Sequence, residues 1–174
     1  MASYPKLIRG TAAWLYTAIK AQLPTINAEL TANVVGAKTA PQFALVMGDP
    51  PVVNTPTIAL GFGSLTRTRF AQHNYRFDLN FRITVLIPHA ADDTAQNYEM
   101  CREIAADNLL SLFSDEVLTL TPSINAGPLG TAHALSTDFS TLMDIFPRKQ
   151  ADGITVVRGF EMPLTISFTL TSHS

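Results

Sequence analysis

Apolar residues recur along this chain with two periods, and each period predicts one type of secondary structure. Near the N-terminus they recur every three or four positions, which is typical of an amphipathic helix. We expect this helix over about residues 5–23, ending before Pro24 because proline lacks the N–H that continues a helix. The apolar positions of this stripe are Ile8, Ala12, Leu15, Ile19 and Leu23.

A strict alternation follows in the middle of the chain. From Tyr75 to Ile87 every second residue is aromatic or aliphatic, which predicts a strand with one buried face that ends at Pro88. The period then changes again, and about residues 93–113 form a second amphipathic helix that carries Cys101 on its apolar stripe.

The last third predicts a long β-hairpin over about residues 134–171. One strand falls within 134–146, a polar turn covers 148–153, and the returning strand runs from Ile154 to Leu170. At about 3.3 Å per residue this strand would span roughly 55 Å, whereas the radius of gyration of such a domain is about 16 Å. We therefore expect the strand to bend, at Gly159 or Pro163, or to project as an arm, with Pro163 suited to an edge or a bulge.

The remaining segments are less regular. Residues 24–72 predict short strands around 34–35, 43–47 and 57–60, and a short strand at 117–120 precedes a loop at 122–130. The fold class is therefore α+β, a mostly antiparallel β-sheet with long β-hairpins packed against two amphipathic helices. We expect a single domain over residues 1–174.

Composition narrows the classes of function. Only 15% of the residues are charged and the formal net charge is −2, so the chain has no basic field for gripping nucleic acid. No apolar run reaches the length of a membrane span, so we expect no membrane partner. Because the chain has so few charges, much of its surface is neutral, and removing this surface from water costs little free energy. Such a surface is typical of a subunit that shares it with other copies.

The residues suggest no catalytic, cofactor or metal site. The four histidines lack metal-ligand spacing, and Cys101 is expected to be a packed thiol. His89 beside Asp92 and Asp93 comes nearest to a polar site, and a pocket there would favour a small ligand-binding α+β domain.

Seven residues are candidates for a subunit or partner interface. Two alternatives stay open for Arg76 and Arg82, either a solvated sheet face with Asp78 as partner or a ladder that lines a pore or bridges subunits. The hairpin turn is either a polar tip or a docking element. The seven candidates are Arg76, Arg82, Arg148, Lys149, Gln150, Asp152 and Arg158.

The order of these elements resembles the tail terminator, or tail completion, proteins of long-tailed bacteriophages. The strand Phe81–Pro88, the helix containing Ala105–Leu110 and the terminal strand Leu164–Leu170 are similar to the strand, helix and strand core of that family. The resemblance covers most of residues 5–171 in outline and rests on order and spacing. Residues 24–72 are longer than the minimal form of the family.

The resemblance implies a structural virion protein without enzymatic activity. Six copies would form a ring that caps the tail tube protein and meets the head-side connector or neck protein, with DNA only as passing cargo in the lumen. The protein would reside in the virion tail or neck, and in the host cytoplasm during assembly. The alternatives are another neck or connector protein, or a tail-tube or baseplate component that stacks into polymers.

Overall fold

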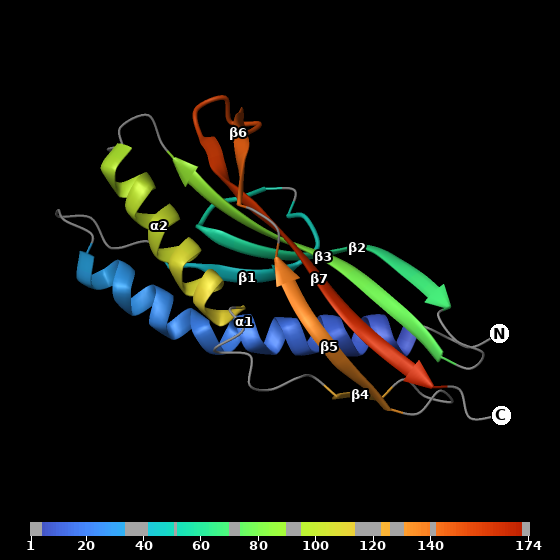
Figure 1. Ribbon diagram of the computed structural model, residues 1–174. Coiled ribbons are helices and arrows are strands. Elements are labelled where there is room, and N and C mark those ends of the chain that lie inside the picture. The colour runs from blue at the N-terminus through green and yellow to red at the C-terminus, as the bar shows by residue number, and fades with distance from the viewer. Residues whose placement is uncertain are drawn as a thin grey trace.

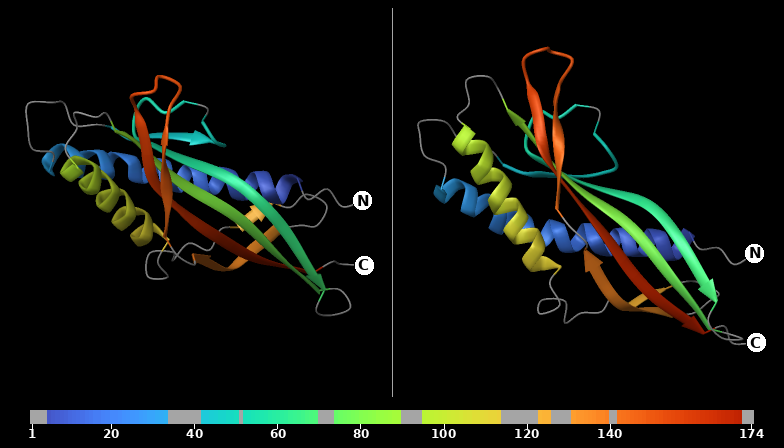
Figure 2. Two further views of the ribbon diagram at one scale, coloured as in Figure 1. Left: turned by 90° about the horizontal axis from the view of Figure 1, so that it is seen from above. Right: turned by 45° about the horizontal axis from the view of Figure 1, so that its top comes forward.

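A computed structural model of the chain describes residues 5–33, 42–50, 52–69, 74–89, 95–113, 123–125, 131–139 and 142–171. Two helices and seven strands occupy these residues (Figures 1 and 2). The expected α+β class with a mostly antiparallel sheet is confirmed. The expected short strands at 34–35 and 117–120 lie outside the described residues.

The first helix is longer than its sequence pattern predicted. Helix α1 spans Pro5–Asn33 and continues through Pro24, so the expected end at residue 23 is wrong. Proline removes one backbone hydrogen bond, but Ile26 and Leu30 extend the stripe of Leu15 beyond it, and both are fully buried. Burial of two such side chains, worth roughly 1.5–3 kcal/mol each, offsets the cost of the proline.

The second helix matches its prediction closely. Helix α2 spans Ala95–Leu112, with Cys101 buried on its inner face as expected. Asn108 is a buried polar residue between the two helices. Its Oδ1 accepts a hydrogen bond from Gln22 of α1 at 2.7 Å, and its Nδ2 donates to Glu29 of α1 at 3.0 Å. This pair of contacts fixes the position of α2 along α1.

The strands form one sheet in the order β1, β2, β3, β7, β5, β4, with β6 also paired to β7. Strand β1 lies parallel to β2, and all the other pairs are antiparallel. The strands are β1 (Ala44–Met47), β2 (Thr57–Arg69), β3 (Asn74–His89), β4 (Ser123–Asn125), β5 (Thr131–Phe139), β6 (Met143–Lys149) and β7 (Val156–Thr171). Strand β4 lies inside the loop expected at 122–130, and β3 includes Pro88, where it was expected to end.

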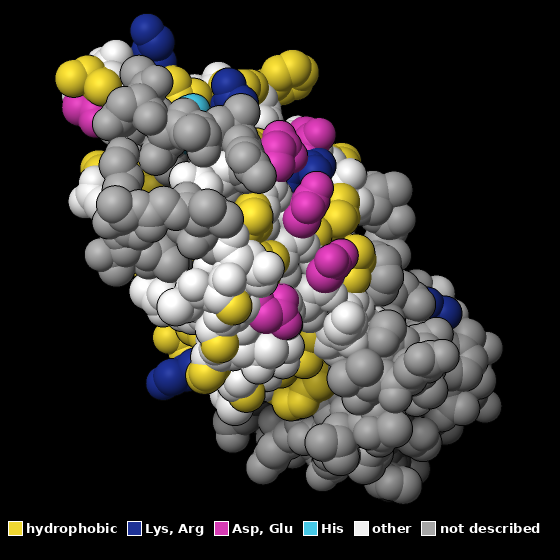
Figure 3. All heavy atoms as spheres, turned by 90° about the vertical axis from the view of Figure 1, so that its left-hand side faces the viewer, with side chains coloured by type: hydrophobic (Ala, Val, Ile, Leu, Met, Phe, Trp, Pro, Cys, Tyr) yellow, Lys and Arg dark blue, Asp and Glu magenta, His cyan; other side chains and the backbone are white. Residues whose placement is uncertain are grey.

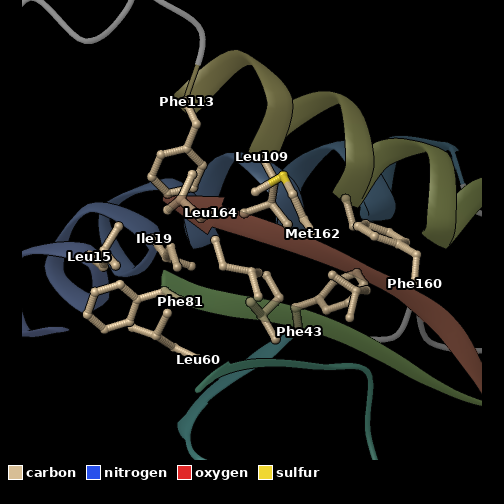
Figure 4. Close-up of a cluster of buried hydrophobic side chains, with 14 of the residues drawn as sticks. Leu15, Ile19, Phe43, Leu60, Phe81, Leu109, Phe113, Phe160, Met162 and Leu164 are labelled. Atoms are coloured by element: carbon tan, nitrogen blue, oxygen red, sulfur yellow. The ribbon is translucent and has the colours of Figure 1, made fainter. Parts of the chain in front are cut away.

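The main core lies between the helices and one face of the sheet (Figure 4). The alternating residues of β3 are buried as predicted, and Phe77 of β3 is the direct cross-strand partner of Phe168 of β7. Asn27 of α1 secures the start of β1, because its Oδ1 accepts the N–H of Phe43 at 2.8 Å. The helices thus cover the face formed by the central strands.

Strand β7 is the central strand of the sheet, so the expectation of an edge position for Pro163 is wrong. It pairs with β3 along its whole length, and with β6 and then β5 on its other side. Among the described residues Pro163 has no partner on that other side, because β6 pairs up to Glu161 and the pairs of β5 begin at Leu164. A residue without an N–H is tolerated at this gap.

The expected C-terminal hairpin consists of three strands. Its first arm is divided into β5 and β6, which pair with different halves of β7. The turn covers residues 150–155, and β7 begins at Val156 where Ile154 was expected. The β6–β7 hairpin extends beyond the helices in each view (Figures 1 and 2).

A second, smaller cluster lies on the other face of the sheet. Val157 and Leu86 are buried there with Val53, and Ile145 packs against them. Val157 therefore faces away from the helices. From Phe160 onward, every second side chain of β7 is buried on the side of the helices. This cluster joins the β6–β7 hairpin, close to its turn, to the segment that follows β1.

Candidate functional site

The β6–β7 hairpin carries large apolar side chains on its surface. Phe146 is 92% exposed and Ile154 67%, and Met143 is about half exposed. A phenylalanine side chain that stays in water contributes no burial free energy to the stability of a monomer. Exposed apolar patches on a protein surface mark interaction sites. We call Met143, Phe146 and Ile154 the hairpin patch.

A bulge in β6 determines the position of Phe146. Ile145 pairs with Gly159 and Arg148 pairs with Val157, so Phe146 and Pro147 together lie opposite a single residue, Arg158. Bulges of this kind change the direction of a side chain and interrupt the pairing of a strand. The bulge therefore accounts for an aromatic residue that is outside both clusters.

Two side chains of the predicted turn serve the fold itself. Gln150 donates to the carbonyl of Val53 at 2.6 Å and accepts the N–H of Val53 at 3.0 Å, which ties the tip to the segment before β2. Asp152 accepts the backbone N–H groups of Ile154 and Thr155, and the hydroxyl and amide hydrogen bonds of these residues lower its pKa. Arg148 and Lys149 are exposed on the same tip.

A second set of contacts ties the hairpin to α2. Arg102 of α2 forms an ion pair with Asp144 of β6, and the hydrogen bonds that it donates to Asp144 raise the pKa of that guanidinium. Arg158 of β7 places its guanidinium carbon 5.5 Å from the centre of the Tyr98 ring, and its buried Nε has no hydrogen-bond partner within the part of the chain that the structure describes. Arg158, a candidate interface residue, therefore lies against α2 and away from the exposed tip.

The sheet face opposite the helices carries a polar network. Arg76 donates to Asp78 at 2.8 Å and to Ser167 at 3.1 Å, and Ser167 donates to Asp78 at 2.6 Å. Arg82 contacts Asp49 at 3.2 Å and Glu161 at 3.7 Å. Both candidate arginines of β3 are thus on one face, as expected, and Arg76 has the expected partner, Asp78.

The network predicts a dependence of stability on pH. Partial burial acts to raise the pKa of Asp78, but the hydrogen bonds from Ser167 and Arg76 and the charge of Arg76 outweigh it, so the pKa is lowered. A lowered carboxyl pKa gives stability that is present above the ordinary value of about 4 and is lost as the pH falls through the native pKa. Between pH 6 and pH 3, the free energy of unfolding measured in urea should fall less in the Asp78→Asn variant than in the wild-type protein. Equal losses in both proteins would contradict this assignment.

The opposite edge of the sheet also carries exposed apolar residues. Met47 is 57% exposed at the end of β1, and its partner Leu60 precedes Phe62, which is 44% exposed and packs edge-on against Phe81. Beyond Leu60, residues 61–69 of β2 have β3 on one side and no strand on the other within the described residues. We call Met47 and Phe62 the edge patch.

Charges on the helical side are arranged in a row. Glu99, Glu103 and Asp107 recur every four residues on the exposed face of α2, and acidic side chains gather on this side of the molecule (Figure 3). Like charges at this spacing destabilise an isolated helix slightly. The row makes this face of α2 acidic, whereas the cations Arg148 and Lys149 of the hairpin are matched by Asp144 and Asp152 in the same hairpin.

The polar site considered near His89 is not established. The ring of His89 packs near Tyr98 at 6.4 Å, while Asp92 and Asp93 lie outside the described residues. No group of three or more potential metal ligands occurs among the described residues. Nor is any helix in the described part of the chain long and apolar enough to cross a membrane.

Comparison with known proteins gives no family. No family model matches the chain, and no curated protein matches it. One solved structure without a functional name is 12% identical, with an alignment that covers 91% of this chain and 96% of that one, at a TM-score of 0.34. A likeness this weak carries no argument about fold or function.

Sequence reasoning missed the residues with the most unusual surface environment. It selected the charged and polar residues of the turn and overlooked Phe146, Met143 and the edge patch. One signal was present, because Phe146 and Pro147 directly precede the polar turn, where a phenylalanine has no evident place in a core. The other residues could not be recognised without the pairing of the strands.

Proposed function

We propose that the protein is a structural subunit of a bacteriophage tail, a tail terminator whose copies form a ring on the end of the tail tube. The ring stops growth of the tube and presents a surface to the head-side connector. The observation that carries the proposal is the exposure of Phe146 on a projecting hairpin, since a nearly fully exposed phenylalanine is explained by burial against another chain.

Several further features support a subunit with shared surfaces. The described residues leave a long edge of β2 unpaired, and an open strand edge adheres to other strands unless it is covered. The low charge content reduces the cost of covering these surfaces. The identification of the assembly as a terminator rests on the resemblance in element order, and six copies are the number that this resemblance implies.

The mechanism is geometric and involves no reaction. A contact between two different surfaces of identical copies either closes into a ring or continues as a filament. A closed ring leaves no unpaired contact, so assembly ends at a fixed number of copies. A tube or baseplate component would use the same type of contact but would stack into longer polymers.

Negative-stain electron microscopy of the purified protein tests the proposal. We expect closed rings of one diameter. Open tubes would favour a tube or baseplate component and would contradict a terminator, and isolated subunits at micromolar concentration would remove the support for any self-assembling role.

A further inference from the structure

We propose that strand β6 opens from β7 as a unit while the main core stays folded, and that a latch at the hairpin tip holds it closed. The latch is the contact between the side chain of Gln150, in the turn of the hairpin, and Val53, in the segment that follows β1. This device belongs to the single chain and goes beyond the proposed ring.

Few contacts hold β6 to the rest of the protein. Within the described residues it pairs only with β7. Its side chains from Met143 to Lys149 are exposed except for Ile145, which is half-buried, and none of them belongs to the main core. Strand β7 meanwhile pairs with β3 along its whole length. Strand β6 can therefore separate from β7 while the core between the helices and the sheet stays closed.

The latch joins the hairpin tip to a single residue of a loop. Val53 is 2% exposed, whereas its neighbours Val52 and Asn54 are exposed. The Nε2 of Gln150 donates to the carbonyl oxygen of Val53 at 2.6 Å, and its Oε1 accepts the N–H of Val53 at 3.0 Å. One side chain thus satisfies both backbone groups of a half-enclosed loop residue, as a neighbouring strand would do.

The small cluster couples the latch to β6. Val53 from the latch and Ile145 from β6 both pack on Val157 of β7 and Leu86 of β3. Val157 is fully buried and Leu86 nearly so, although they lie on the face of the sheet that the helices do not cover. Release of Val53 exposes side chains that Ile145 also covers, so the latch and β6 stabilise each other.

A second contact on the helix side contributes less. Arg102 of α2 forms an ion pair with Asp144 of β6, but the Asp144 side chain is 72% exposed and that of Arg102 is 31% exposed. Ion pairs so open to water add little stability. The partly buried hydrogen bonds of Gln150 are therefore the main fastening of β6 outside its pairing with β7.

Opening of β6 uncovers a strand edge. The register places β6 opposite β7 from Val156 to Glu161, so the backbone groups on this side of β7 lose their partners when β6 leaves. Val157 is then exposed beside them. A strand edge of this kind pairs readily with other strands, so the closed latch keeps an adhesive edge covered.

Hydrogen exchange of the backbone amides, followed by NMR, tests the proposal. In the wild-type protein, the amides of Val53 and of β6 that are hydrogen-bonded should share one opening, with protection on the order of 100-fold lower than that of Phe168 in the core. Gln150→Ala removes both hydrogen bonds of the latch. Exchange should become about tenfold faster at Val53 and, together with it, in β6.

Two results would overturn the proposal. Protection of the β6 amides equal to that of Phe168 in the wild-type protein would exclude opening as a unit. Faster exchange at Val53 alone in Gln150→Ala would show that the contact does not hold β6.

Lys149→Ala is the matched control, because Lys149 is an exposed neighbour of Gln150 on the same tip, and it should keep the wild-type exchange rates. Continued protection of Phe168 verifies that both variants are folded. The exchange reports on contacts within each chain, so either contradicting result leaves the proposed ring to its own test by microscopy.

Discussion

Replacing Gly159 with alanine is expected to unfold the β6–β7 hairpin or the whole protein. A Cβ atom at this position would lie 1.7 Å from the carbonyl oxygen of Val85, and the φ angle of Gly159 is +156°. Neither β3 nor β7 can move away, because each is bonded on both sides and buries the main core. We expect a loss of at least about 3 kcal/mol in the free energy of unfolding, measured by urea denaturation.

Gly61→Ala is the matched control for this experiment. Gly61 is also a strand residue, in β2, but a Cβ there would lie 3.9 Å from its nearest neighbour, the carbonyl oxygen of Arg82, which is an ordinary contact. The control should change stability by less than about 1 kcal/mol. Similar losses in the two variants would show that the close approach of Gly159 to β3 is not the cause.

Truncation of Phe168 should have the second-largest effect. Phe168 is fully buried in the centre of the sheet and lies directly opposite Phe77 in the register of β3 and β7. Phe168→Ala should cost about 3–5 kcal/mol, because it loses buried area and leaves a cavity between strands that cannot close. Phe168→Leu keeps most of the buried volume and should cost clearly less.

The same position tests whether the two aromatic residues act together. The loss in the double variant Phe77→Ala with Phe168→Ala should differ from the sum of the two single losses by more than about 0.5 kcal/mol, since direct neighbours share one cavity. Strictly additive losses in urea unfolding would contradict their placement as cross-strand partners.

The sequence predicted the elements whose pattern is set locally. Strand β3 and helix α2 each bury one regular face against the core, so alternation or helical spacing is visible in the residues themselves. The continuation of α1 past Pro24 was not predictable in this way, because burial of Ile26 and Leu30 by distant strands outweighs a local preference. The division into β5 and β6 likewise depends on β7, because each of these two strands pairs with a different half of β7.

The candidate interface was predicted only in part. The sequence placed polar residues at the hairpin tip, but the side chains of Gln150 and Asp152 bond within the chain, and Arg158 lies against Tyr98. Exposure of Phe146 depends on the bulge in β6, which only the pairing of β6 with β7 reveals. This feature cannot be derived from composition or periodicity.

The mass of the wild-type protein in solution tests the central claim most directly. Size-exclusion chromatography with multi-angle light scattering should give a single species whose mass is a whole multiple of 18.9 kDa and does not change over a tenfold dilution. A ring of six copies would give six times that mass. A species of 18.9 kDa at every concentration would contradict the account.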